Sequence, residues 1–384
     1  MAKVSASKSR MLPLLVVLHG YIGARLLPDL GLGVGAVVAG ALLLAASAVV
    51  IPLGFRARRS VGRGRRQWVM WIGLVAMGAF SSLLVLTVLR DAGLLLLLGV
   101  VHLTDASVPL DAIVRDSAWA VPIITLIVTA LGYYNARRVA GVRHVDVPID
   151  ALPMPLHGFT IAQITDLHVG PTIGRDHVDA IVDAVNALGA DMIAITGDLV
   201  DGSVRQLAGH TAPLARLAAR HGTFFVTGNH EYYSGVTPWI GELRRLGMHV
   251  LLNEHRVIVH EGAEIVVAGV TDFSAHHFDP VHRSDPRVAI AGAPARVAKV
   301  LLAHQPRSAP AAAAAGFHLQ LSGHTHGGQF LPWNWFVRFQ QPFTSGLARF
   351  GELWVYTSRG TGYWGPPKRL GAPSEITCLR LVAA

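Results

Sequence analysis

The sequence contains very little cysteine and little charge. Cys378 is the only cysteine among 384 residues, and Asp, Glu, Lys and Arg together make up 15%. A single cysteine excludes an intramolecular disulfide and is compatible with a reducing compartment. Hydrophobic residues make up 52%, which is too apolar for an ordinary soluble protein. The sequence therefore predicts a protein that is partly embedded in a membrane.

The apolar residues are concentrated before about residue 135, in runs of the length that a bilayer demands, roughly 20 residues each. We expect spanning helices at 11–28, 30–54, 68–89 and 118–135. The segment 92–103 is also apolar, but a run of roughly 10 residues is too short to cross. We expect this segment to be re-entrant or interfacial; a crossing there would invert the topology.

Positive charge decides the expected orientation. The connection 55–67 is rich in arginine, and such segments stay in the cytoplasm. Two further crossings return the chain to that side, so we expect a multi-pass protein of the cell membrane with a cytoplasmic carboxy-terminal half. Attraction to membrane lipids of negative charge accounts for the net charge of +9, and no nucleic-acid partner is expected. Arg25, Arg90 and Asp91 are expected to snorkel to the interface.

Composition divides the chain into three expected parts. Residues 1–138 form the transmembrane region, residues 139–157 contain three prolines and no helical period, as a linker does, and residues 158–384 form one α/β domain. In that domain, polar motifs follow five apolar strands, which we expect at 159–165, 192–196, 223–227, 300–303 and 317–321. The carboxyl ends of successive strands are where α/β folds usually place their sites.

The polar motifs supply one set of possible metal ligands. They are Asp166-Leu-His168, Gly197-Asp198-Leu-Val-Asp201, Gly228-Asn229-His230-Glu231, the single His304, and Gly323-His324-Thr-His326-Gly-Gly-Gln329. Carboxylate, amide and imidazole groups without a thiolate suit Mn, Fe or Zn better than calcium. Seven such ligands are too many for one tetrahedral ion but suit two divalent metal ions that share a carboxylate. Two ions about 3.5–4 Å apart are the usual device for phosphoryl displacement.

The order of these motifs resembles that of the calcineurin-like metallophosphoesterase superfamily, over about residues 158–382. The last motif and the multi-span amino terminus are similar to its membrane-associated bacterial branch, which includes UDP-diacylglucosamine pyrophosphatase-like proteins. The resemblance implies an α/β fold, a four-layer α-β-β-α sandwich, preceded by an all-α transmembrane domain of about four helices.

The resemblance also implies roles for single residues. Asp166, His168 and His326 would hold the first metal, Asn229, His304 and His324 the second, and Asp198 would bridge them, while His230 would be a histidine near the leaving group that binds no metal. Asp201 is expected to support a neighbouring group or to cap the backbone. Glu231 stands where the family motif often has Asp, which leaves the support of His230 open.

We expect hydrolysis of a phosphate ester or pyrophosphate, with a phospholipid-like or nucleotide-linked substrate. The alternatives are a cyclic-nucleotide phosphodiesterase, a nuclease, or a non-catalytic metal-binding membrane scaffold. Arg359 and His277 are possible substrate contacts, although solvated positions are favoured for them and for Lys368 and Arg369. The aromatic stretch Trp333–Phe339 either dips into the membrane interface or packs in the core; the sequence leaves both open.

Overall fold

The computed structural model describes residues 2–58 and 65–384. The chain divides into two compact units, a helical unit of Met1–Tyr134 with Gly365–Lys368 and an α/β unit of Asn135–Trp364 with Arg369–Ala384. Of the arginine-rich connection on which the expected orientation rests, Arg59 and Arg63 lie outside the described residues.

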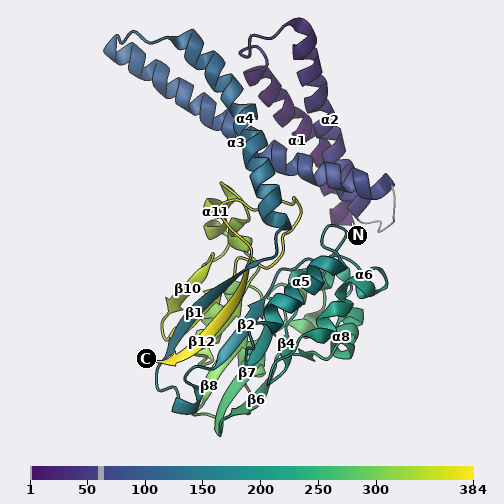
Figure 1. The fold of residues 1–384 in the computed structure, drawn as a ribbon, viewed down its shortest axis with the longest axis vertical. Coiled ribbons are helices and arrows are strands. Elements are labelled where there is room, and N and C mark those ends of the chain that lie inside the picture. The colour runs from purple at the N-terminus through teal and green to yellow at the C-terminus, as the bar shows by residue number, and fades with distance from the viewer. Residues whose placement is uncertain (1, 59–64) are drawn as a thin grey trace. The chain divides into compact units, whose positions relative to one another are not determined.

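The helical unit contains four long helices, as predicted (Figure 1). They are α1 (Ala2–Leu26), α2 (Val34–Arg58), α3 (Arg65–Thr104) and α4 (Leu110–Arg137). Three helices are long and apolar enough to cross a membrane, over Val34–Ala57, Gln67–Thr104 and Leu110–Arg137. The apolar part of α1 is limited to Met11–Leu26, which is shorter. The structure therefore offers three candidate spans among the described residues rather than the predicted four.

Residues 92–103 do not form a separate re-entrant or interfacial segment, because they continue α3 to Thr104 without a break. No proline interrupts this helix. At 40 residues and about 1.5 Å per residue, α3 is roughly 60 Å long, about twice the hydrocarbon thickness of a bilayer.

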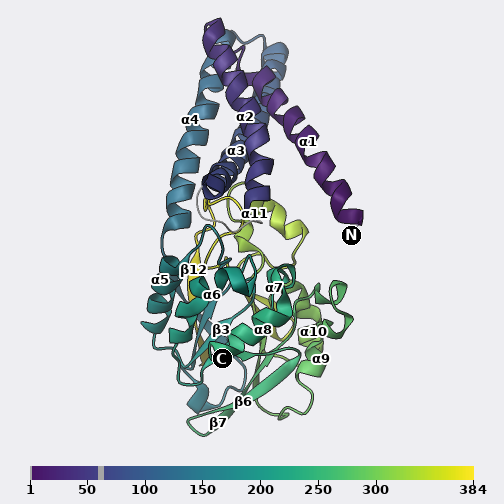
Figure 2. The same ribbon diagram turned by 90° about the vertical axis from the view of Figure 1, so that its right-hand side faces the viewer.

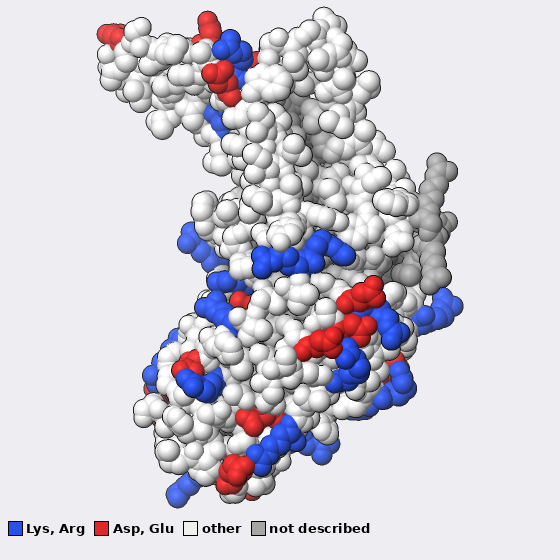
Figure 3. Space-filling view, viewed as in Figure 1, with Lys and Arg blue, Asp and Glu red and all other residues white. Residues whose placement is uncertain are grey.

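Charged side chains of the helical unit pair with one another. Arg25 Nε lies 2.8 Å from Asp91 Oδ2, and the buried Arg90 lies 2.5 Å from Asp29 Oδ2. Tyr21 donates a further hydrogen bond to Asp91. Figure 3 shows that charged residues are otherwise sparse over the helices and frequent over the α/β domain. Arg25 of α1 thus pairs with Asp91 of α3, and Arg90 of α3 pairs with Asp29 in the connection between α1 and α2, while the snorkelling of these residues to the interface stays a prediction.

The α/β unit contains two six-stranded sheets (Figure 1). The first has the order β1-β12-β2-β3-β4-β5 and the second the order β10-β11-β9-β8-β7-β6. The strands are β1 (Gly141–Ile149), β2 (Thr160–Ile164), β3 (Met192–Ile195), β4 (Thr223–Phe225), β5 (His249–Val250), β6 (Glu254–His260), β7 (Ala263–Gly269), β8 (Ala298–Leu302), β9 (Leu319–Ser322), β10 (Gly346–Phe350), β11 (Leu353–Thr357) and β12 (Glu375–Ala383). The pairs β2–β3, β3–β4 and β8–β9 are parallel.

Helices cover the outer faces of both sheets, so the domain has the four layers predicted (Figure 2). On the first sheet they are α5 (Arg175–Asn186), α6 (Val204–Thr211) and α8 (Val236–Arg245), and on the second sheet α9 (Pro286–Ala289) and α10 (Ala309–Ala314). Two further short helices, α7 (Asn229–Ser234) and α11 (Trp333–Phe336), lie in the connections after β4 and β9. In β2, Ile161 faces the core between the sheets and Ala162 faces the core under α5. This alternation buries both faces of the strand, which explains why the central strands are apolar throughout.

The predicted linker contains a strand. Gly141–Ile149 forms β1, which pairs in parallel with β12 over its whole length. Pro148 is tolerated because β1 lies at the edge of the sheet, where a missing N–H group breaks no ladder on the outer side. Val145, Val147 and Ile149 alternate with polar residues or proline, a strand pattern that the prolines obscure.

Candidate metal centre

The predicted ligand residues follow the carboxyl ends of five strands from both sheets. Asp166 and His168 follow β2, Asp198 follows β3, Asn229 begins α7 after β4, His304 follows β8, and His324 and His326 follow β9. Parallel strands bring their carboxyl ends to one edge of each sheet. The structure therefore gathers all seven residues, which are separated by up to 160 positions in sequence, at neighbouring loops.

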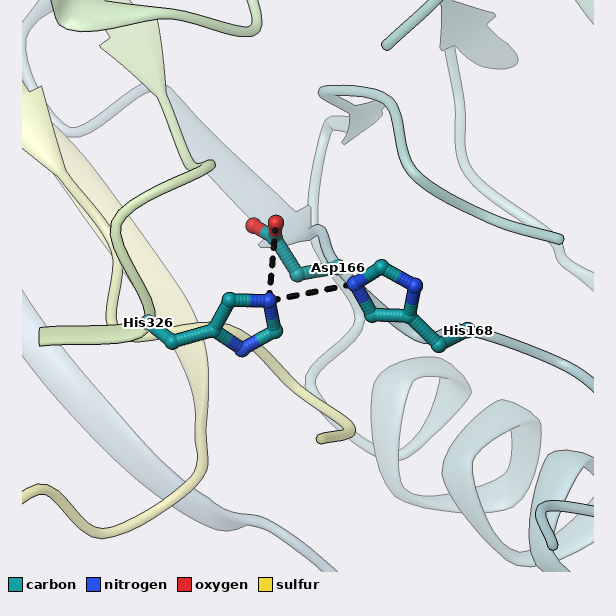
Figure 4. A group of neighbouring side chains, drawn as sticks. All are labelled: Asp166, His168 and His326. Atoms are coloured by element: carbon teal, nitrogen blue, oxygen red, sulfur yellow. Dashed lines mark hydrogen bonds and ion pairs between the residues drawn. The ribbon is translucent and has the colours of Figure 1, made fainter. Parts of the chain in front are cut away.

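The first cluster consists of Asp166, His168 and His326, whose ligand atoms all lie within 4.8 Å of one another. Nε2 of His326 lies 3.4 Å from Oδ1 of Asp166 and 3.1 Å from Nε2 of His168 (Figure 4). Two imidazole nitrogens that face each other at this distance share at most one proton. A cation between them would satisfy both lone pairs.

The second cluster consists of Asp198, His304 and His324. Nδ1 of His304 donates a hydrogen bond to the carbonyl of Thr196 at 2.8 Å, so its Nε2 is turned toward Oδ2 of Asp198, 3.2 Å away. The same Nε2 lies 3.2 Å from Nδ1 of His324. A hydrogen bond on one ring nitrogen that leaves the other for a cation is the usual arrangement of a metal-binding histidine.

Asn229 adds an unsatisfied oxygen. Its side chain is buried, and its Oδ1 has no hydrogen-bond partner among the described residues. A buried amide oxygen without a partner costs free energy, about 1–3 kcal/mol, unless a bound cation or another ligand interacts with it. The donor set and this orphaned oxygen fit a pair of divalent metal ions.

The charges of the site favour binding of cations. Burial lowers the pKa of His304, but the charge of Asp198 outweighs it and raises this pKa well above its usual value. Burial and the guanidinium of Arg369 hold the pKa of His326 well below its usual value. Burial and the neighbouring His304 lower the pKa of His324 to about 3. The lowered pKa values keep His324 and His326 neutral, which is the form of imidazole that binds metals, whereas the raised pKa of His304 means that this ring would release a proton when a cation binds. Shifts of this kind are typical of functional sites.

The backbone of these loops is strained. Five of the seven residues have φ between 51° and 69°, namely Asp166, His168, Asp198, His324 and His326. Residues other than glycine rarely adopt this conformation. Gly228 allows the loops to approach closely, because a Cβ there would lie 2.2 Å from Oδ1 of Asp198. The glycine that precedes Asn229 therefore lets the loops after β3 and β4 pack together.

Glu231 supports the backbone rather than the ring of His230. Its side chain is fully buried, and its two oxygens accept hydrogen bonds from the N–H groups of Asp198, Leu199, Val200 and Gly228 at 2.6–3.3 Å. Burial and the charge of Asp198 raise the pKa of Glu231 to about 8, while the N–H donors act in the opposite direction. This carboxyl group therefore ties the loop after β3 to the loop after β4.

Asp201 lies beside two histidines and makes a hydrogen bond with one of them, His230. Its Oδ1 lies 2.5 Å from Nδ1 of His230, and its Oδ2 lies 3.3 Å from Nδ1 of His168. Nε2 of His230 is 3.9 Å from Oδ2 of Asp198, so the free end of the ring faces the ligand clusters. Burial lowers the pKa of His230, but Asp198 and Asp201 outweigh it and raise the pKa to about 8.

Aromatic side chains surround His230 on the solvent side. Its ring centroid lies 5.2 Å from that of Tyr233 and 6.1 Å from that of Trp364, and both of these rings are exposed. Gln329, the last residue of the fifth motif, holds the Trp364 loop. Its amide group donates to the Trp364 carbonyl at 2.9 Å and accepts from the Trp364 N–H at 2.8 Å.

The prediction that Arg369 and Lys368 are solvated is wrong. Arg369 is fully buried and donates to the carbonyls of His326, Arg359 and Ala372, and Lys368 is buried as well. A buried guanidinium that is saturated with backbone carbonyls shapes the metal loop and has no donor to spare for a phosphate.

Of the two possible substrate contacts, Arg359 and His277, only Arg359 lies near the metal loop. Arg359 is partly exposed, pairs with Glu375 at 3.8 Å, and lies with its aliphatic stem against Gly327 in the metal loop. His277 is exposed and packs against His276, in a 3-10 turn outside both ligand clusters. Arg359 alone lies beside the site.

Sequence reasoning missed the roles of Gln329, Trp364 and Arg369. Gln329 ends the motif that begins at Gly323, so its place in that motif could have indicated a role at the site. Arg369 has no such signal, because it lies 43 residues after His326 and reaches it only through the fold.

Known proteins resemble the chain in this region. Residues 159–328 match the family of calcineurin-like phosphoesterases. A Bos taurus protein described as a transmembrane protein with metallophosphoesterase domain is 41% identical over 273 residues, which are 68% of this chain and 61% of that protein. An uncharacterized metallophosphoesterase from Aquifex aeolicus is 30% identical over 223 residues, 58% of this chain and 84% of its own.

Among solved structures, a 5'-nucleotidase precursor from Thermus thermophilus is similar over 58% of this chain and 54% of its own, with a TM-score of 0.38 and 16% identity. The chain spans about three fifths of the length of the Bos taurus relative. The match to the Aquifex protein, together with the ordered ligand motifs, shows that the chain belongs to the calcineurin-like metallophosphoesterases, a family of phosphoric ester hydrolases.

Proposed function

We propose that this protein is a membrane-anchored, two-metal phosphoesterase that hydrolyses a phosphate ester or a pyrophosphate. The observation that carries the proposal is the pair of buried ligand clusters with the orphaned oxygen of Asn229 between the strand ends. One divalent ion would be held by Asp166, His168 and His326, and the other by His304 and His324 together with Asn229. Asp198 would contribute to both ions, since it groups with His304 and His324 and also with His168 of the first cluster and His230.

Two bound metal ions would supply Lewis-acid polarisation of the phosphoryl group and activation of a water molecule. The protein's own contribution to leaving-group departure is assigned to His230. Asp201 holds its Nδ1, which leaves Nε2 to donate a proton to the departing oxygen. The pKa of about 8 keeps much of His230 protonated at neutral pH, as a general acid requires.

A lipid-linked or a nucleotide-linked phosphoester is the proposed substrate class, and the catalytic domain is proposed to lie in the cytoplasm. The basic connection between α2 and α3 favours that side, and α3 and α4 supply two crossings before the α/β domain begins. Three candidate spans instead of four leave this inference unchanged. The orientation depends on the basic connection and on the two crossings after it, and α1 precedes both. The membrane-associated bacterial branch remains the proposed place of the chain within its family.

The proposal is tested with detergent-purified protein and two soluble substrates, bis-p-nitrophenyl phosphate and p-nitrophenyl phosphate. Hydrolysis is measured after treatment with a chelator and again after addition of Mn²⁺, Zn²⁺, Fe²⁺ or Mg²⁺. We expect turnover that depends on metal and that Asp198→Asn abolishes. Asp176→Asn, an exposed carboxylate in the first turn of α5, is the matched control and should keep full activity.

The assay also separates the enzyme from a metal-binding scaffold. Two bound metals per chain without turnover on any tested phosphoester would contradict catalysis and leave the scaffold as the function. A preference for the diester or the monoester would narrow the class of substrate.

A further inference from the structure

An exposed aromatic patch follows the metal loop directly. It consists of Leu331 just before α11, of Trp333, Trp335 and Phe336 in α11, and of Phe339 in the 3-10 turn after it. Their exposed fractions range from 39% for Leu331 to 75% for Phe339. The sequence left open whether the stretch Trp333–Phe339 packs in the core. The structure shows that it does not, because these side chains are exposed. Burying these rings would remove a large apolar area from water.

The patch is fixed to the metal loop. A Cβ on Gly328 would lie 2.2 Å from the Cα of Asn334, so the backbone of α11 lies directly against the turn that carries His326. Leu331 N–H also donates to the carbonyl of Leu370 at 3.1 Å. Whatever covers the patch is thereby held beside the metal centre.

The covalent connection to the helical unit is short. Helix α4 ends at Arg137 and β1 begins at Gly141, so only residues 138–140 join the last candidate span to the first strand of the α/β unit. A bilayer that α4 crosses is therefore a surface to which the α/β unit is covalently tethered.

The composition of the patch matches the membrane interface. Tryptophan and phenylalanine on an exposed turn are enriched at the boundary between headgroups and acyl chains. Arg338 is exposed in the same turn, and its guanidinium lies 5.3 Å from the ring centroid of Phe339. A cation at the edge of an apolar face suits a surface that carries anionic headgroups.

We propose that the aromatic patch inserts into the lipid interface and presents the metal centre to phosphoesters that reside in the membrane. This inference deepens the proposed function, on which its substrate class rests. The occupant of the patch is the lipid bilayer, and the substrate is an amphiphile whose phosphate lies at headgroup depth.

The insertion is tested by fluorescence of the full chain in vesicles of phosphatidylglycerol and phosphatidylethanolamine. The buried Cys378 is replaced by alanine, and single cysteines are introduced by Trp335→Cys or by Met154→Cys and labelled with an environment-sensitive dye. Met154 is the matched control, because it is 72% exposed and precedes β2, at the sheet edge opposite the metal centre. Quenching is compared between iodide in water and nitroxide attached to the lipids.

We expect the label at position 335 to be quenched by lipid nitroxide and shielded several-fold from iodide, and the label at position 154 to show the reverse. Equal iodide access at both positions would overturn the proposal. So would shielding at position 335 that disappears when the protein is diluted among more vesicles, because a second copy of the chain would then be the occupant.

A triple substitution, Trp335→Ser with Phe336→Ser and Phe339→Ser, tests the consequence for substrates. Because these side chains are exposed, the fold should persist. We expect hydrolysis of soluble bis-p-nitrophenyl phosphate to be unchanged and hydrolysis of a phosphoester embedded in vesicles to fall roughly tenfold. An equal fall on both substrates would contradict the lipid contact. Absence of turnover on any substrate would refute the phosphoesterase, whereas quenching reports insertion without needing turnover.

Discussion

Nδ1 of His230 lies 2.5 Å from Oδ1 of Asp201, and this contact decides which end of the ring is available for chemistry. A carboxylate on one imidazole nitrogen orients the ring and favours a proton on that nitrogen. The other nitrogen then faces Asp198 and the ligand clusters. Asp201 thus acts on the reaction through His230.

Asp201→Asn should lower kcat by about 10–100-fold, because a neutral amide stabilises the protonated ring less well than a carboxylate does. The loss should be larger for an alkyl leaving group than for p-nitrophenolate, which departs without a proton. Kinetics on a matched pair of diesters checks this expectation. Asp176→Asn is the control, and an equal loss on both leaving groups would assign Asp201 a purely structural role.

Asn229→Ala should remove one of two bound metals. The substitution deletes the oxygen that has no partner in the protein, and the remaining His304 and His324 then hold the second ion more weakly, by roughly 10–100-fold. Elemental analysis after dialysis should show about two ions in the wild type and about one in the variant. Retention of both ions would show that Asn229 is not a ligand. Asp176→Ala, at an exposed position in the first turn of α5, is the control.

Glu231→Gln should destabilise the α/β domain. Above pH 8, where Glu231 is ionised, its carboxylate accepts from four backbone N–H groups, whereas the amide offers one oxygen and would leave two donors unpaired. The expected cost is about 2–4 kcal/mol, which lowers Tm by roughly 4–16 °C. Thermal unfolding of the full chain in detergent measures the change. Glu264→Gln, an exposed carboxyl group on β7, should leave Tm unchanged.

Gln329→Ala should loosen the loop that carries Trp364. Both hydrogen bonds between the Gln329 amide and the Trp364 backbone would be lost, at about 1 kcal/mol each. We expect KM to rise severalfold for substrates with large leaving groups, with metal content unchanged.

Trp364→Ala should act in the same direction, and the double variant should be no worse than either single one, since the two residues act through the same loop. Additive losses would instead show that they act separately.

Candidate metal ligands could be picked out from the sequence because the pattern that marks them is local. Asp166, Asp198 and His304 each follow an apolar strand, and the strand pattern reports burial on both faces. The helices of the amino-terminal half could be predicted for the same reason, since a long apolar run can be read directly along the chain. Among the described residues four long helices are present, and three of them are long and apolar enough to cross a membrane.

Long-range contacts were not accessible. The pairing of β1 with β12 joins Gly141 to Glu375. Prolines in residues 139–157 hid the strand pattern of β1 in the sequence. Arg369 lies in the connection between β11 and β12 and donates to the carbonyl of His326 in the loop after β9, and the support of His230 by Asp201 depends on loops after different strands.

By itself the sequence determined the chemistry: apolar helices that demand a bilayer, and an ordered set of carboxylates, amide and imidazoles that demands metal ions. Periodicity and ligand type are properties of short segments, so they can be read along the chain. Only the tertiary structure decided which carboxyl group supports which histidine, that a basic residue is buried under the metal loop, and that the aromatic stretch beside it is exposed. These outcomes depend on packing between segments that lie far apart in sequence, where local patterns carry no information.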